Sequence, residues 1–255
     1  MQTVSMLITG AQMDTFRQAL EAAFEDRMVS HFREELPDLS AGAGETGLRS
    51  AIRLGRERAR GYGLGGAASV CSFLTVMFLL GSGFDDDPLL PWASSILRGA
   101  AREPEDITGT RLREGTLAYL DEAEGGDCEL LDEVLARLRD EPLDLLLPPF
   151  HGDGTAAYIR SRLSRLYPGK CSLAGEDGLR AMVDQALPAA KASGLESAQG
   201  AGLYAILMLM LGAHFERDPL LPWAREALER VRAAPARDRE AELRRALSRW
   251  AGGEA

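Results

Sequence analysis

One stretch of thirteen residues occurs twice in this chain, and its two copies lie 131 residues apart. Gly81–Ala93 and Gly212–Ala224 both follow the pattern G-x-x-F-x-x-D-P-L-L-P-W-A. The same offset holds upstream without a gap, since Ala43–Arg49 matches Ala174–Arg180 at every position but one. Similarity at a fixed offset indicates a duplicated structural unit, here of about 70 residues. We refer to the two copies of the pattern as the first and the second corner.

Apolar residues recur at helical spacing. Between residues 12 and 36 they follow each other at intervals of three and four, which places them on one face of a long helix. These residues are Met13, Phe16, Leu20, Phe24, Met28 and Phe32. Ala67–Leu80 and Ser197–Leu211 are almost entirely apolar and predict one buried helix in each half. No useful stretch alternates between apolar and polar residues, so we predict an all-α fold without a significant sheet.

Glycine and proline set the expected helix ends. The expected helices cover 12–36, 45–60, 67–80, 107–122, 128–139, 156–166, 176–192, 197–211, 223–231 and 237–250. We expect Pro37 and the cluster Ser40–Gly44 to separate the first two. The proline-containing stretch Glu141–His151 is the expected boundary between the halves. The predicted architecture is two tandem pseudo-symmetric helical units, at residues 6–140 and 150–250.

Each corner has one phenylalanine, one aspartate and one tryptophan at matching positions. In a functional interpretation these side chains bind a protein partner; they are Phe84, Asp87, Trp92, Phe215, Asp218 and Trp223. In a structural interpretation each corner stops a helix, its aspartate caps the next helix, and its tryptophan is buried against the core. We favour the structural interpretation, because both copies keep the same residue types, as a device needed once in each half would.

Composition limits the partners and the compartment. The formal net charge is −10, so a nucleic-acid backbone is not an expected partner. The three cysteines have no metal-ligand spacing and indicate a reduced protein. The first residues lack the basic, apolar and small-residue regions of a signal peptide. We therefore expect a cytoplasmic protein.

No combination of residues predicts catalysis, a metal or a cofactor. Asp85–Asp87 offers oxygen ligands for a hard cation, but the second corner places Arg217 among the corresponding residues. The histidines His31, His151 and His214 do not have paired-ligand spacing. Neither a phosphate-binding nor a dinucleotide-binding glycine pattern follows a predicted strand. We therefore expect a protein that is not an enzyme.

Two uncharged stretches raise the alternative of membrane insertion. They are Tyr62–Phe84 and Ser197–His214, and about 20 apolar residues are enough to span a bilayer. Their glycine, alanine and serine content, the missing basic flanks and the acidic residues that follow favour buried helices instead.

Two stretches of the first half carry a resemblance to a known family. The first runs from Gln12 to His31, and the second, Gly61–Ala93, contains L-x-x-M-F-x-L-G-x-x-F-D-x-D-P-x-L-P-W-A. Together they resemble an uncharacterised all-helical family whose members occur in bacterial loci that encode type VI secretion effectors and spike-tip proteins. The resemblance covers about Gln12–Leu97 and supplies no catalytic residues. It implies an accessory protein of secreted toxins.

These observations together predict a non-enzymatic helical interaction protein. The leading hypothesis is an adaptor or chaperone that binds a secreted toxin or effector of a type VI secretion system and brings it to the spike. An immunity protein that neutralises a cognate toxin is the alternative within the same class. A membrane-active protein that uses the two apolar helices is the alternative from a different class.

Overall fold

The computed structural model describes residues 10–125 and 128–253. Within those ranges the chain contains helices and no strand, which confirms the all-α prediction. The α-helices are α1 (Gly10–Glu35), α2 (Pro37–Gly61), α3 (Ala67–Leu80), α4 (Pro91–Gly99), α5 (Glu105–Glu124), α6 (Glu129–Asp140), α7 (Leu143–Leu146), α8 (Thr155–Leu166), α9 (Pro168–Ala192), α10 (Ala198–Leu211), α11 (Pro222–Ala233) and α12 (Arg239–Ala251). Short 3-10 helices η1 (Ala100–Arg102), η3 (Phe215–Arg217) and η4 (Ala236–Asp238) lie between them.

The duplication is visible in the bounds of the helices. α2 and α9 begin and end 131 residues apart, and so do α3 and α10. Both α2 and α9 are kinked at a glycine with positive φ, at Gly44 (66°) and Gly175 (70°). Glycine adopts this angle without a steric penalty. The prediction that the whole cluster Ser40–Gly44 breaks the helix is wrong, because only Gly44 departs from helical angles.

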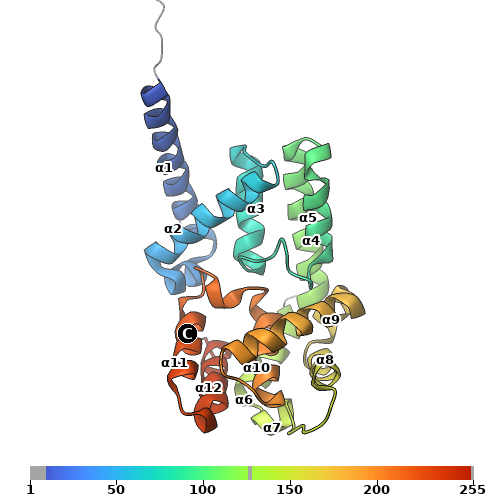
Figure 1. Cartoon of the computed structure of the whole chain (residues 1–255). Coiled ribbons are helices and arrows are strands. Elements are labelled where there is room, and N and C mark those ends of the chain that lie inside the picture. The colour runs from blue at the N-terminus through green and yellow to red at the C-terminus, as the bar shows by residue number, and fades with distance from the viewer. Residues whose placement is uncertain (1–9, 126–127, 254–255) are drawn as a thin grey trace, which may run out of the picture.

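The two halves lie one above the other in Figure 1, with α2 to α5 in the upper half and α8 to α12 in the lower half. In the upper half α3 packs against α5 and α2, and in the lower half α10 packs against α9, α8 and α12. Most side chains of α3 and nearly all of α10 are buried. The two apolar stretches are therefore core helices, as predicted.

Each half has an apolar core cluster of its own. Val134 and Leu138 of α6 belong to the cluster of the second half, and α6 packs against α12 as well as α5. In the predicted division these residues fall within the first unit, 6–140. The division into 6–140 and 150–250 and the pseudo-symmetry of whole units stay predictions; residues 6–9 and 126–127 lie outside the described ranges.

Candidate functional site

The two corners lie against each other, and the aspartate of each bonds to the other half. Asp87 Oδ2 accepts a hydrogen bond from the backbone N–H of Ala213 at 2.8 Å. Asp218 Oδ2 accepts one from the backbone N–H of Ser82, also at 2.8 Å. The two bonds correspond to each other at the offset of 131 residues. The repeated aspartate therefore joins the halves.

The second carboxylate oxygen of each aspartate stays within its own corner. Asp87 Oδ1 accepts from the backbone N–H of Leu89, and Asp218 Oδ1 accepts from that of Leu220, both at 2.8 Å. Burial raises the pKa of both aspartates, and the backbone N–H groups oppose this shift. The prediction that Asp87 caps the next helix is wrong, since α4 begins at Pro91 without a side-chain cap.

Glycines allow the ends of α3 and α10 to touch. A Cβ atom on Gly81 would lie 2.6 Å from the carbonyl oxygen of Leu211, and one on Gly212 would lie 2.7 Å from that of Leu80. Both glycines also have positive φ, 99° and 89°. Any other residue would be strained and would push the halves apart.

Each corner also inserts a leucine into the core of the opposite half. Leu89 is 2% exposed and belongs to the cluster of the second half, whereas Leu220 is 3% exposed and belongs to that of the first. Complete burial of a leucine side chain contributes about 1.5–3 kcal/mol. Each core is therefore completed by the other half.

Four of the six predicted partner-binding residues lie inside this junction. Phe84 and Phe215 are 0% and 1% exposed, and Asp87 and Asp218 are 3% and 4% exposed. With the halves packed together, these side chains have no surface to offer a partner. A direct role for them in partner binding stays a prediction, and it would require the halves to separate.

The two tryptophans are less buried than the structural interpretation predicts. Trp92 lies beside Tyr119, with ring centroids 6.1 Å apart, and Trp223 stacks on Trp250 at 6.0 Å. Both tryptophans are partly exposed. They cover the edge of the two cores and do not fill their centres.

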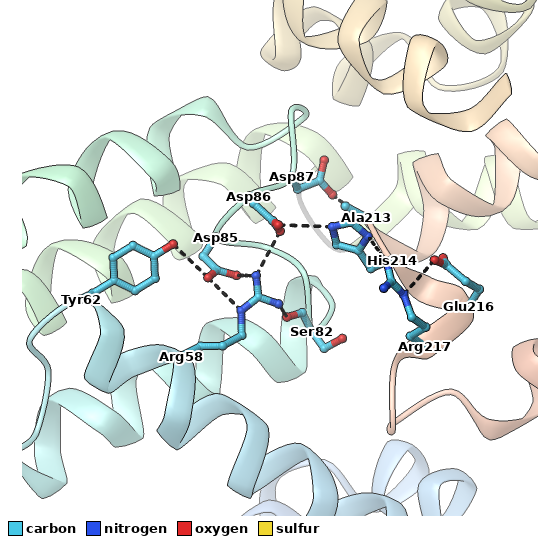
Figure 2. A network of polar contacts seen from close by, with 10 residues as sticks. All are labelled: Arg58, Tyr62, Ser82, Asp85, Asp86, Asp87, Ala213, His214, Glu216 and Arg217. Atoms are coloured by element: carbon cyan, nitrogen blue, oxygen red, sulfur yellow. Dashed lines mark hydrogen bonds and ion pairs between the residues drawn. The ribbon is translucent and has the colours of Figure 1, made fainter. Parts of the chain in front are cut away.

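Arg58 of α2 holds the acidic turn of the first corner (Figure 2). Its Nη2 lies 2.6 Å from Asp85 Oδ1, and its Nη1 donates to the carbonyl oxygen of Ser82 at 2.9 Å. The hydroxyl of Tyr62 donates to Asp85 Oδ2 at 3.1 Å. Burial raises the pKa of Asp85, and Arg58 opposes this shift. The sequence gives no signal for Arg58, because its counterpart at the offset of 131 residues is Ala189.

The polar network crosses to the second corner through His214 (Figure 2). Its Nε2 lies 3.3 Å from Asp86 Oδ2, and its Nδ1 lies 3.1 Å from Arg217 Nη2. Arginine can only donate, so Nδ1 accepts and the proton of the neutral ring is on Nε2, facing Asp86. His214 has a φ of 63°, which is uncommon for a residue other than glycine.

The contact between His214 and Asp86 is expected to make stability depend on pH. The hydrogen bond to Asp86 raises the pKa of His214 above 6.5, and the same bond lowers the pKa of Asp86 below 3.8. The stabilisation is therefore complete between pH 3.8 and 6.5. It is lost as the pH rises through the folded-state pKa of His214 or falls through that of Asp86. Both side chains are more than a third exposed, so we expect at most about 1 kcal/mol.

Denaturant melts at a series of pH values measure this effect. The His214→Asn variant should lose the decline in unfolding free energy above pH 6.5 that the unaltered chain shows. Identical pH profiles for both proteins would contradict the assignment.

A cavity of about 270 Å³ also lies between the halves. Its apolar lining includes Leu39, Phe78, Leu131, Met210, Leu221 and Trp250. Its polar lining includes Tyr119, whose buried hydroxyl has no hydrogen-bond partner in the described part of the chain, and Lys170, whose pKa is lowered by burial. The cavity has room for a small molecule, with Lys170 as the cationic group of its lining.

The first part of α1 projects from the body of the protein (Figure 1). Residues 10–20 are all exposed, and we refer to them as the arm. Met13, Phe16 and Leu20 lie on one face of the arm and are 48%, 68% and 61% exposed. Isolated helices shorter than about 12–15 residues are marginal in water, and most gain stability by packing an apolar face. The arm therefore has an apolar face that its own chain leaves uncovered.

In the described ranges, no group of three or more His, Cys, Asp or Glu side chains is arranged to hold a metal ion. The helices described here do not include one that combines the length and the apolarity needed to cross a bilayer. Comparison of the chain with protein families, with curated proteins and with solved structures finds no significant match.

Proposed function

We propose that this chain is a non-enzymatic interaction protein whose arm binds a protein partner. The observation that carries the proposal is the exposed row of Met13, Phe16 and Leu20 on a projecting helix. Contiguous exposed apolar side chains typically mark interaction sites. An amphipathic helix commonly binds by laying such a face into a groove of its partner.

We further propose that the partner is a secreted toxin or effector of a type VI secretion system. In this proposal the chain is a cytoplasmic adaptor or chaperone that brings its cargo to the spike. Support comes from the resemblance carried by Gln12–His31 and Gly61–Ala93. The net charge of −10 also suits a basic partner.

Charged substitutions on the arm are expected to abolish partner binding without unfolding the chain. Phe16→Asp and Leu20→Asp should each weaken binding about tenfold or more, because each places a carboxylate in an apolar contact. Both side chains are exposed, so the free energy of unfolding should change by no more than about 0.5 kcal/mol. The matched control is Leu117→Asp on α5, where the leucine is 67% exposed and lies outside the arm.

Affinity purification from the native host, with mass spectrometry, provides the measurement. Recovery of an effector together with spike components, lost in Phe16→Asp and kept in Leu117→Asp, would support the adaptor. An effector alone, whose toxicity is neutralised by co-expression, would support an immunity protein instead. Equal recovery by all variants would contradict a role for the arm.

A further inference from the structure

The second half contains a groove of about 640 Å³ where α8, α9 and α10 meet. Its walls include Thr155 at the start of α8, Leu187 and Lys191 near the end of α9, and Ala198 and Ala201 of α10. Leu187 is partly exposed. Lys191 is exposed and forms no ion pair with the described residues. The groove is therefore apolar inside, with an uncompensated positive charge at its rim.

The equivalent position in the first half is filled by α1. Glu21 of α1 lies 3.1 Å from Arg56 and 2.5 Å from Arg60. The guanidinium of Arg56 also lies 5.3 Å from the centre of the Phe24 ring. At the offset of 131 residues, Arg56 and Arg60 correspond to Leu187 and Lys191 of the groove. One acidic and one aromatic side chain therefore occupy in the first half the place that is open in the second.

The second half lacks both of these side chains. At the same offset, Phe24 corresponds to Thr155 and Glu21 corresponds to Gly152. α8 begins at Thr155, because Gly152 and Gly154 precede it and Gly154 has a φ of 118°. Threonine is too short to fill the space of a phenylalanine ring. The replacement of Arg56 by Leu187 makes the open position more apolar than its counterpart.

We propose that this groove binds an amphipathic helix of a protein partner, with an acidic residue one turn before an aromatic residue. The acidic side chain pairs with Lys191, and the aromatic ring lies against Leu187. A second copy of this chain does not supply such a helix, since Phe24 is 9% exposed and Glu21 is engaged by two arginines. The inference deepens the proposed function by naming a second contact for a protein partner, and it does not involve the arm.

A peptide with the sequence of residues 10–28 is a suitable probe, because it carries Glu21 and Phe24 in the required spacing. Fluorescence anisotropy measures the binding of the labelled peptide to the full chain. Lys191→Glu in the protein should weaken binding about tenfold or more, and Glu21→Lys in the peptide should do the same. The two changes combined should restore binding, because the charges are then opposite again.

Two further variants separate the groove from its counterpart. Arg60→Glu reverses the charge in the first half and should leave peptide binding unchanged. Thr155→Phe fills the groove and should abolish binding, while circular dichroism shows an intact fold. The proposal is overturned if the peptide does not bind, or if Arg60→Glu abolishes binding and Lys191→Glu does not.

Self-association provides a third test. If the chain without peptide forms oligomers that Lys191→Glu dissociates, the occupant of the groove is a second copy and the proposal is wrong. Failure of the arm variants to affect partner recovery would contradict the function proposed for the arm, and it would leave these peptide results unchanged.

Discussion

Asp218→Ala is expected to lower the free energy of unfolding by about 2–6 kcal/mol. The substitution leaves the buried N–H groups of Ser82 and Leu220 without acceptors, and each such group costs about 1–3 kcal/mol. Asp87→Ala should have a similar effect, because it removes the acceptor of Ala213 and Leu89. Urea denaturation followed by circular dichroism gives the free energies.

The control for this prediction is Asp177→Ala, where the aspartate side chain is 98% exposed. It should change the free energy of unfolding by no more than about 0.5 kcal/mol. The double variant of Asp87 and Asp218 should lose less than the sum of the two single losses, because both bonds hold the same junction. If Asp218→Ala unfolds like the control, the aspartates do not hold the halves together.

The internal repeat was sufficient to predict much of the fold. The bounds of α3, 67–80, agree with the expected helix, because an uninterrupted apolar run ends at Gly81. The buried role of α10 followed from the same reasoning. These predictions succeed because helix periodicity and glycine stops act locally along the chain.

The junction could not be predicted in the same way. The repeat shows that Asp87 and Asp218 correspond, but it does not show which backbone groups they bond. A cap within the same corner and a bond to the other half need the same residue type, and the structure uses one oxygen for each. The exchange of Leu89 and Leu220 between cores depends likewise on how the halves pack.

Some residues of the sites carry no repeated signal. Arg58, His214 and Lys170 each have a different residue type at the corresponding position of the other half. Leu187 and Lys191 of the groove look like ordinary residues of a helix end. They gain meaning only from the comparison with Arg56 and Arg60, which α1 covers in the first half.

The second large effect is expected from a single methyl group on α9. In Gly178→Ala the new Cβ would lie 2.5 Å from the carbonyl oxygen of Pro88 in the first corner. The backbone on both sides belongs to the junction, so the halves must shift apart. Overpacking of this kind costs about 1–3 kcal/mol, and it outweighs the gain of about 1 kcal/mol that alanine gives in a helix. Gly47→Ala should behave in the same way, because its Cβ would meet the carbonyl oxygen of Pro219.

Gly42→Ala is the matched control, since it tests the same substitution in α2 without the contact. Nothing lies within 4 Å of a Cβ at Gly42, so alanine there should stabilise the chain by up to about 1 kcal/mol. Thermal and urea melts of the three variants should therefore give opposite signs, destabilising at Gly47 and Gly178 and stabilising at Gly42. Stabilisation at all three positions would mean that the corners do not press against α2 and α9. The sign at Gly178 thus tests the contact between the halves independently of the aspartate hydrogen bonds.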